Sequence, residues 1–201
     1  MPWLELAVAI GVGYLVGAIP SGVLIGRLRG IDPRDSGSGR TGTTNAIRSL
    51  GATLAVAVAT LDLGKGIAAV LIGQAIGAEP LAGALAGVAA VIGHVKSVFI
   101  GFHGGRGVAT GAGAMLVLAP LTILVAVPEL IMVIWATRLV SLASLSAATT
   151  VAIVSIVLYL VGWVGAEVIV ASVLIGVVVV LSHFDNIGRL LAGTERRFGR
   201  D

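Results

Sequence analysis

The sequence predicts an all-α membrane protein with seven transmembrane helices, its N-terminus outside and its C-terminus in the cytoplasm. Of its 201 residues, 57% are hydrophobic and only 11% are charged, whereas an ordinary soluble domain carries about 25% charged residues. The mean hydropathy is +1.08, so most of the surface must face lipid. The third observation is that one arrangement of spans collects nearly all basic residues on one side, as cytoplasmic loops do. We expect a single integral membrane domain over residues 1–201.

The clearest spans follow from length. A helix needs roughly 20 apolar residues to cross about 30 Å of hydrocarbon. Segments 3–26, 52–77, 146–164 and 166–182 meet or nearly meet this requirement. The next apolar segment begins at Leu81 but is short, because the polar stretch "GHVKSVFIGFHGGRGVAT" interrupts it at residue 93.

The segment 111–137 is apolar but contains Pro120 and Pro128, so it fits either one long span or a hairpin of two short helices. Charge decides between them. A hairpin over 108–137 places every Lys and Arg except Lys65 on one side, whereas a single span would put the C-terminal arginines outside. With the hairpin, the other side carries only acidic residues: Glu5, Glu79 and Glu167, with Glu129 beside the hairpin turn.

The short, interrupted helices predict a pocket. Non-helical backbone is tolerated at membrane depth only where protein or a water-filled cavity covers it. Broken helices around 93–110 therefore indicate a pocket that opens to the cytoplasm. Glycines at small-xxx-small spacing predict close helix contacts, in the pairs Gly13/Gly17, Gly22/Gly26 and Gly83/Gly87. The chain has no cysteine, which excludes disulfides and thiolate metal sites.

The stretch "SGSGRTGTTNAIR", residues 36–48, has the composition of an anion site. It is not a nucleotide-binding P-loop, because Thr43 stands where that motif needs lysine. Its glycines let backbone amides point inward as an anion nest. Arg40 and Arg48 can bind phosphate oxygens through two hydrogen bonds each. The glycines, hydroxyls and Asn45 together favour a phosphate site over a merely solvated loop.

Two further segments offer charge at the same face. "GFHGGRGVATGAG" combines a glycine-rich turn, Arg106 and a helix that begins near Val108, and helix N-termini attract anions. On its own this segment fits a flexible loop equally well. His183 and Asn186 have i,i+3 spacing where the last span ends, so they share one face of a helix. Asp62 and Lys65 are spaced for an ion pair within the second span, with a role in positioning the loops as the alternative.

Together these segments resemble the bacterial acyl-phosphate:glycerol-3-phosphate acyltransferases, the PlsY family. The motifs that carry the resemblance occur in the family's order: "SGSGRTGTTNAIR" (36–48), "DLGKG" (62–66), "GHVKSVFIGFHGGRGVAT" (93–110), "TRLVSLAS" (137–144) and "HFDNIGRLLAGTE" (183–195). The chain departs from the usual family residues at Arg40, Thr43, Lys96, Ser97, His103 and Arg106, and the last two replace lysines.

The resemblance implies transfer of a fatty acyl group from acyl phosphate to the 1-hydroxyl of sn-glycerol 3-phosphate, giving lysophosphatidic acid and phosphate as the first step of phospholipid synthesis. It implies no cofactor, no metal and no nucleic acid partner. The protein is expected in the bacterial inner membrane, with membrane lipid around it, as a monomer whose active site faces the cytoplasm. The expected catalytic residues are His183, Asn186 and Ser38. The expected substrate-binding residues are Gly37, Gly39, Gly42, Thr44, Asn45, Arg48, His94, Gly104, Gly105, Arg106, Gly107, Ser141 and Ser144.

A transporter of an anionic metabolite is the competing class, because broken helices whose ends face an anion are also transporter features. The polar clusters favour the enzyme, since all of them lie on one predicted face and no comparable site opens outward.

Overall fold

Helices supply all the regular structure within residues 2–77 and 79–199, the parts of the chain that this computed structural model describes. The long helices are α1 (Pro2–Ala18), α4 (Ala52–Ile76), α5 (Pro80–Val95), α7 (Pro120–Thr137), α8 (Val140–Leu160) and α9 (Ala166–Ser182). The shorter elements are α2 (Ser21–Arg27), η1 (Pro33–Asp35), α3 (Thr43–Leu50), η2 (Val98–Ile100), α6 (Val108–Leu118) and α10 (Phe184–Leu191). The predicted all-α class is confirmed.

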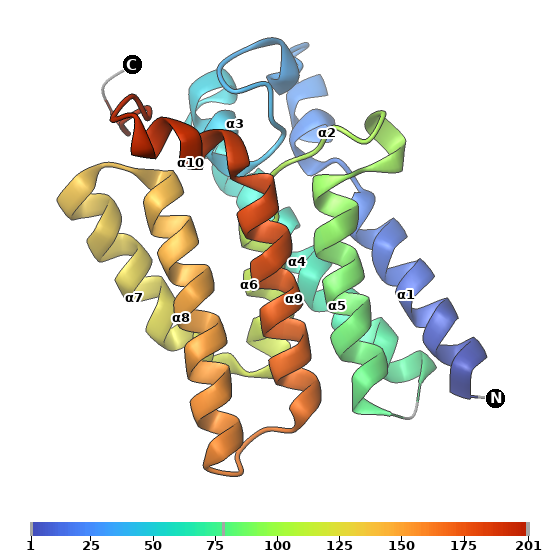
Figure 1. Ribbon diagram of the computed structural model, residues 1–201. Coiled ribbons are helices and arrows are strands. Elements are labelled where there is room, and N and C mark those ends of the chain that lie inside the picture. The colour runs from blue at the N-terminus through green and yellow to red at the C-terminus, as the bar shows by residue number, and fades with distance from the viewer. Residues whose placement is uncertain (1, 78, 200–201) are drawn as a thin grey trace.

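By length and composition, the described residues contain fewer membrane-spanning helices than the predicted seven. Within the described residues, five helices or helix pairs are long and apolar enough to cross a membrane, and the bent pair α9–α10 makes a sixth. The remaining predicted span, α6, has 11 residues, which is too short to cross alone. Figure 1 shows α1, α4, α5, α6, α7, α8 and α9 running alternately up and down, so that the start of α1 and the end of α10 lie at opposite ends of the bundle.

The first predicted span qualifies as a single crossing, although its helix is interrupted near the end. Trp3–Arg27 qualifies as a single candidate span, but α1 ends at Ala18 and α2 begins after Pro20. Lys65 Nζ donates to the carbonyl oxygen of Ile19 at 3.0 Å, within this break. The freed backbone acceptor is therefore satisfied inside the protein, as a break at membrane depth requires.

The segment after residue 107 consists of two helices, as the hairpin prediction required. α6 ends at Leu118, Ala119 is non-helical, and Pro120 opens α7, where its missing N–H costs nothing. Two boundaries differ from expectation. α8 begins at Val140, not 146, and Glu129 lies in mid-α7, where it accepts a hydrogen bond from Ser146 of α8, instead of at the hairpin turn.

Close helix contacts depend on two of the three predicted glycine pairs, Gly13/Gly17 and Gly83/Gly87, whereas Gly22 and Gly26 pack against the loop carbonyls of Thr41 and Ile31. A Cβ on Gly13 or Gly17 of α1 would overlap the backbone of Ala86 or Ala90 of α5. A Cβ on Gly113 of α6 would likewise overlap the backbone of α4. These contacts join α1, α4, α5 and α6 into one tightly packed group.

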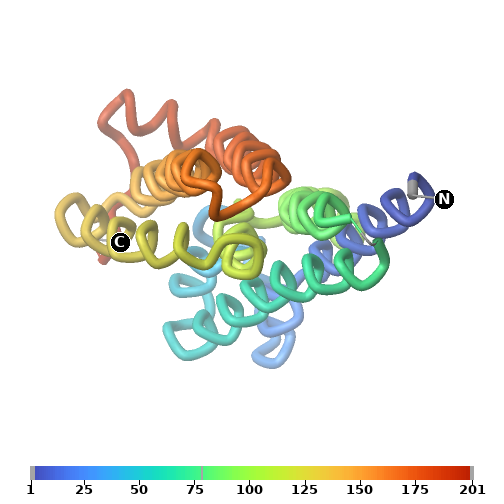
Figure 2. The backbone as a smooth tube through the Cα atoms, turned by 90° about the horizontal axis from the view of Figure 1, so that it is seen from below, coloured from blue at the N-terminus to red at the C-terminus, as the bar shows by residue number. Residues whose placement is uncertain are grey.

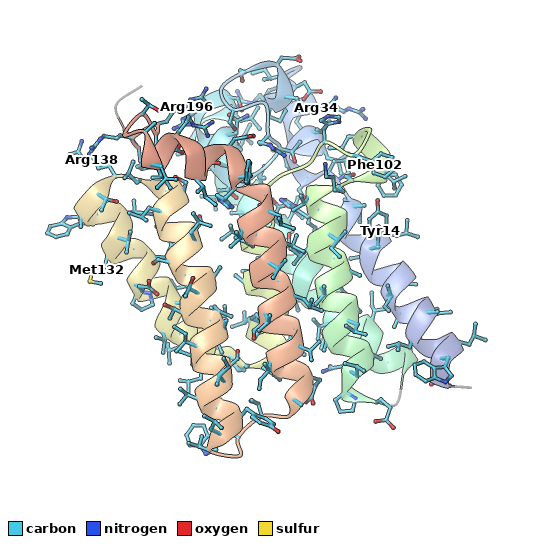
Figure 3. All side chains as sticks on the ribbon, in the orientation of Figure 1. Tyr14, Arg34, Phe102, Met132, Arg138 and Arg196 are labelled. Carbon is cyan, nitrogen blue, oxygen red and sulfur yellow. The ribbon has the colours of Figure 1, made fainter. Side chains whose placement is uncertain are left out.

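α7, α8 and α9 form a second group on the other side of α6, whereas α2 and α3 pack on α4. Figure 2 shows α6 in the middle, with α7 and α8 on one side and α1, α4 and α5 on the other. α7 packs on α8 and α6 and leaves much of its surface apolar and exposed; Trp135 is 84% exposed. Figure 3 shows Met132 projecting outward from this helix, while Arg34, Arg138 and Arg196 gather at the upper end of the bundle. We call this the arginine-rich end.

Candidate active site

A cavity of about 470 Å³ opens at the arginine-rich end. Its wall includes residues of the four polar segments 36–48, 93–110, 137–144 and 183–195, and apolar residues of α4, α6, α7 and α8. Its polar lining residues are Ser38, Arg40, Thr43, Thr44, Asn45, Arg48, Asp62, His94, Arg106, Ser141, Ser144, His183, Asn186, Arg189, Glu195 and Arg196. One compartment thus joins segments that lie far apart in the sequence.

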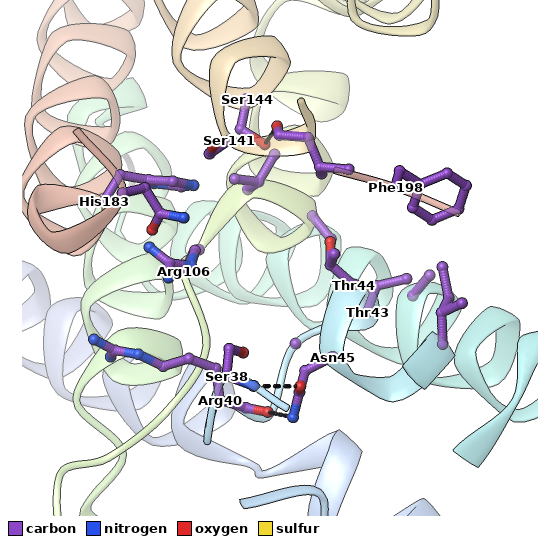
Figure 4. Close-up of a pocket in the computed structure, with 18 of the residues that line it drawn as sticks. Ser38, Arg40, Thr43, Thr44, Asn45, Arg106, Ser141, Ser144, His183 and Phe198 are labelled. Atoms are coloured by element: carbon purple, nitrogen blue, oxygen red, sulfur yellow. Dashed lines mark hydrogen bonds between the residues drawn. The ribbon is translucent and has the colours of Figure 1, made fainter. Parts of the chain in front are cut away.

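Asn45 organises the first glycine-rich loop. Its side chain is 2% exposed; Nδ2 donates to the carbonyl oxygens of Pro33, Ser36 and Arg40, and Oδ1 accepts from the amide of Ser38 at 2.8 Å. Figure 4 shows two of these bonds beneath the cavity. The amide of Asn45 is therefore fully used within the loop, and its effect on a ligand passes through the backbone that it holds.

The glycines of this loop have two separate functions. Gly37 and Gly39 have φ of +61° and +67°, which side chains rarely adopt, and neither lines the cavity. A Cβ on Gly37 would also overlap Asn45 Oδ1. Gly42 lines the cavity and precedes the first turn of α3, so the free amides of Thr43 and Thr44 lie at a helix N-terminus on the wall.

The second glycine-rich loop is built on the end of α5. The amides of Gly104 and Gly105 donate to the carbonyl oxygens of Val95 and His94, each at 3.1 Å. A Cβ on Gly105 would overlap the ring of His94, so only glycine lets the loop lie this close. Gly107 has φ of +83° and turns the chain into α6.

A buried charged network supports this loop from below. Lys65 Nζ lies 2.9 Å from Asp62 Oδ1, which confirms the predicted ion pair. His94 Nδ1 lies 3.5 Å from the same oxygen. The network therefore links the break after α1, through Asp62, to the ring on which Gly105 rests. Asp62 and His94 also reach the cavity wall.

Arg106 and the end of α9 are held by reciprocal hydrogen bonds. Arg106 Nη1 donates to the carbonyl oxygen of Ser182, and Ser182 Oγ donates to the carbonyl oxygen of Arg106, both at 2.9 Å. Burial lowers the pKa of Arg106 to about 10, and the charges of Arg40 and Arg189 act in the same direction. The guanidinium remains protonated at neutral pH, so a fixed positive charge lies inside the cavity.

His183 lies next to Arg106 at the bend between α9 and α10, which is 63°. Its ring is 2% exposed, and Nδ1 lies 2.8 Å from the carbonyl oxygen of Val179. A carbonyl can only accept, so Nδ1 carries the proton in the neutral ring. Nε2 is then left as the acceptor nitrogen of a side chain on the cavity wall.

Glu195, which the sequence did not single out, fixes the other polar residues near His183. Its Oε1 accepts from Ser141 Oγ at 3.0 Å and from Asn186 Nδ2, and its Oε2 accepts from Arg189 Nε at 2.8 Å. Because the carboxylate orients the Asn186 amide, Asn186 Oδ1 is left buried without a hydrogen-bond partner. The sequence does contain a signal for this role, because Glu195 is an isolated acidic residue between Arg189 and the two arginines that follow Glu195.

Comparison with known proteins shows what kind of cavity this is. A family model described as glycerol-3-phosphate acyltransferase matches residues 7–193. The chain belongs to this family. A glycerol-3-phosphate acyltransferase of Trichlorobacter lovleyi is 43% identical over 94% of this chain and 95% of its own length. That of Deinococcus radiodurans, glycerol-3-phosphate acyltransferase 1, is 42% identical over 98% and 97%.

The fold agrees with a solved member of the family. The crystal structure of PlsY (YgiH), an integral membrane glycerol 3-phosphate acyltransferase in its glycerol 3-phosphate form, superposes with a TM-score of 0.87 at 35% identity, covering 96% of both chains. Its lysophosphatidic acid form gives a TM-score of 0.86. The resemblance seen in the sequence is thereby confirmed, and the protein is an acyltransferase, not an anion transporter.

In this acyltransferase most of the expected site residues lie on the cavity wall: Ser38, Gly42, Thr44, Asn45, Arg48, His94, Arg106, Gly107, Ser141, Ser144, His183 and Asn186. Gly37, Gly39, Gly104 and Gly105 lie outside the wall and shape the two loops. The wall also contains residues absent from the expected set, among them Arg189, Glu195, Arg196, Phe198 and the apolar side chains of α7.

Proposed function

We propose that the enzyme transfers a fatty acyl group from acyl phosphate to the 1-hydroxyl of sn-glycerol 3-phosphate and releases lysophosphatidic acid and phosphate. The observation that carries this proposal is the composition of the cavity at the arginine-rich end. Its rim holds two glycine-rich loops with arginines, which suit the phosphates of two substrates. Its inner wall is apolar, and Val108, Ala112, Leu130 and Ser144 are shared with a smaller apolar cavity of about 70 Å³ between α6, α7, α8 and α9.

Unpartnered acceptors support a position for the attacking alcohol near His183 and Asn186. Asn186 Oδ1 has no partner, and His183 Nε2 has the free lone pair on the same side of the cavity as Arg106. A glycerol hydroxyl donating to either atom, with its phosphate on Arg106, would satisfy both an acceptor on the cavity wall and a partly buried charge. This arrangement supports glycerol 3-phosphate as the ligand of the His183 side.

The chemistry needs little more than positioning and charge stabilisation. The hydroxyl oxygen bonds to the acyl carbon, the bond from that carbon to the phosphate oxygen breaks, and phosphate departs with the electron pair. The hydroxyl proton goes to His183 Nε2 or directly to the departing phosphate, because a phosphate monoester has a second pKa of about 6. The arginines stabilise the charge that develops on the leaving group.

A donor comparison tests the proposal. Purified protein in lipid nanodiscs is given radiolabelled glycerol 3-phosphate with palmitoyl phosphate, palmitoyl-CoA or palmitoyl-acyl carrier protein in parallel. We expect labelled lysophosphatidic acid from palmitoyl phosphate alone, because only that donor carries a phosphate on the acyl carbon for the loop that bears Arg40 and Arg48. Equal product from a thioester would contradict the assignment of the donor.

We further propose that the arginine-rich end faces the cytoplasm of a bacterial inner membrane, with the N-terminus outside. The positive-inside rule supports this orientation. The chain has no cysteine, so single cysteines at the exposed residues Arg29 and Val161 report sidedness directly, because the turns that follow α2 and α8 lie at opposite ends of the bundle. In intact cells a membrane-impermeant maleimide should label Val161→Cys and should label Arg29→Cys only after lysis; the reverse pattern would invert the topology.

A further inference from the structure

The segment Thr194–Phe198, which we call the C-terminal strap, lies just beyond the part of the chain that matches the family model and runs along the rim of the cavity. It is non-helical and follows the turn after α10. The amide of Phe198 donates to the carbonyl oxygen of Arg138 at 2.8 Å. At its other end, Glu195 is bound by Ser141 and Asn186. The strap is thus attached both to the turn between α7 and α8 and to the polar site.

Neighbouring side chains of the strap differ in what they face. Arg196 and Phe198 line the cavity. Arg197, between them, is absent from the wall and donates to the carbonyl oxygen of Thr137 at 3.2 Å. Two arginines of equal charge therefore stand side by side, one at the cavity and one turned to the outer backbone.

Phe198 lies at the end of the cavity remote from the His183 side. Figure 4 shows its ring across the cavity from His183 and Arg106, with Thr43 and Thr44 nearer to it. The apolar residues of the wall include Ile134 at the end of α7 and Val140 at the start of α8, the two helices whose connecting turn holds the strap. The ring therefore extends the apolar wall towards the rim.

We propose that Arg196 and Phe198 bind the acyl donor: Phe198 packs against the acyl chain near its carboxyl end, and Arg196 binds the phosphate attached there. This inference rests on the proposed function. Glycerol 3-phosphate takes the His183 side, so an acyl chain that follows the apolar wall has its phosphate at the opposite rim. A cation two residues from the ring then meets the only anionic group of that substrate.

Kinetics on single variants test the inference. With palmitoyl phosphate and glycerol 3-phosphate varied in turn, Arg196→Gln should raise the KM for palmitoyl phosphate about tenfold, the equivalent of one charge-assisted hydrogen bond. Phe198→Ala should raise the same KM about fivefold through lost apolar contact, and Phe198→Leu should restore most of it. The KM for glycerol 3-phosphate should stay as in the wild type.

Arg197→Gln is the matched control, because it removes the same charge one residue away, and its KM for palmitoyl phosphate should stay at the wild-type value. Arg196, Arg197 and Phe198 are all exposed, so every variant should elute and melt like the wild type. Unchanged donor KM in Arg196→Gln and Phe198→Ala would overturn the inference, as would an equal effect of Arg197→Gln or an equal rise in the KM for glycerol 3-phosphate. A wild type inactive with palmitoyl phosphate would instead overturn the proposed donor, so the two failures are distinguishable.

Discussion

Replacing Arg106 with glutamine is expected to lower kcat/KM by about 10²- to 10³-fold, because removing one partner of a desolvated charge pair costs about 2–5 kcal/mol and Arg106 is the charge proposed to bind the phosphate of glycerol 3-phosphate. Arg106 combines three properties: it is protonated, partly buried, and fixed by the reciprocal bonds to Ser182. Glutamine keeps a hydrogen-bond donor but removes the charge. Initial rates with both substrates varied, on protein of wild-type thermal stability, provide the measurement.

Arg106→Lys is the informative companion variant. Lysine keeps the charge while giving up the planar donor group. We expect it to recover most of the activity lost in Arg106→Gln. If the glutamine variant kept wild-type kcat and KM, Arg106 would serve only to hold Ser182, and the phosphate would have to be bound elsewhere.

Replacing His183 with alanine is expected to lower kcat by about 10²- to 10⁴-fold if the ring accepts the proton of the attacking hydroxyl. The expectation follows from the tautomer, because the Val179 carbonyl holds the proton on Nδ1 and leaves Nε2 free. Turnover at saturating substrates isolates this effect from binding. Near-normal turnover in His183→Ala would show that the proton passes directly to the departing phosphate.

His183→Asn separates the chemical role from the structural one. The asparagine amide can still donate to the Val179 carbonyl, so the bend between α9 and α10 keeps its hydrogen bond, but no basic nitrogen remains. We expect this variant to melt close to the wild type and to turn over as slowly as the alanine variant. An active asparagine variant would assign His183 a positioning role.

The sequence contained enough to predict the class of fold, the polar clusters and the family. Those features depend on local composition: apolar length defines a span, and glycine beside arginine defines an anion loop. The Asp62–Lys65 pair was equally local, since both residues lie one turn apart on one helix.

Features that depend on contacts between distant segments could not be predicted in this way. Asn45 looked like a ligand residue, but its partners are carbonyl groups that only the folded loop brings around it. The role of Glu195 could not be predicted because it depends on the packing of α8 near α10: its partners Ser141 and Asn186 come from these two different helices. The start of α8 was misplaced because serine hydroxyls such as Ser144 bond back to the helix's own carbonyls, which lets polar residues continue the helix.

The position of the cavity determines how substrate concentrations should be expressed. Its rim consists of loops at the arginine-rich end, and its inner wall consists of apolar residues from helices that face lipid. The proposed acyl phosphate substrate dissolves in the bilayer, so the quantity that the enzyme experiences is its mole fraction among lipids, which falls when more lipid or detergent is added. Glycerol 3-phosphate is counted per volume of water. The two Michaelis constants of this protein are therefore expressed in different quantities: a mole fraction within the two-dimensional bilayer for the acyl donor, and a concentration in water for glycerol 3-phosphate.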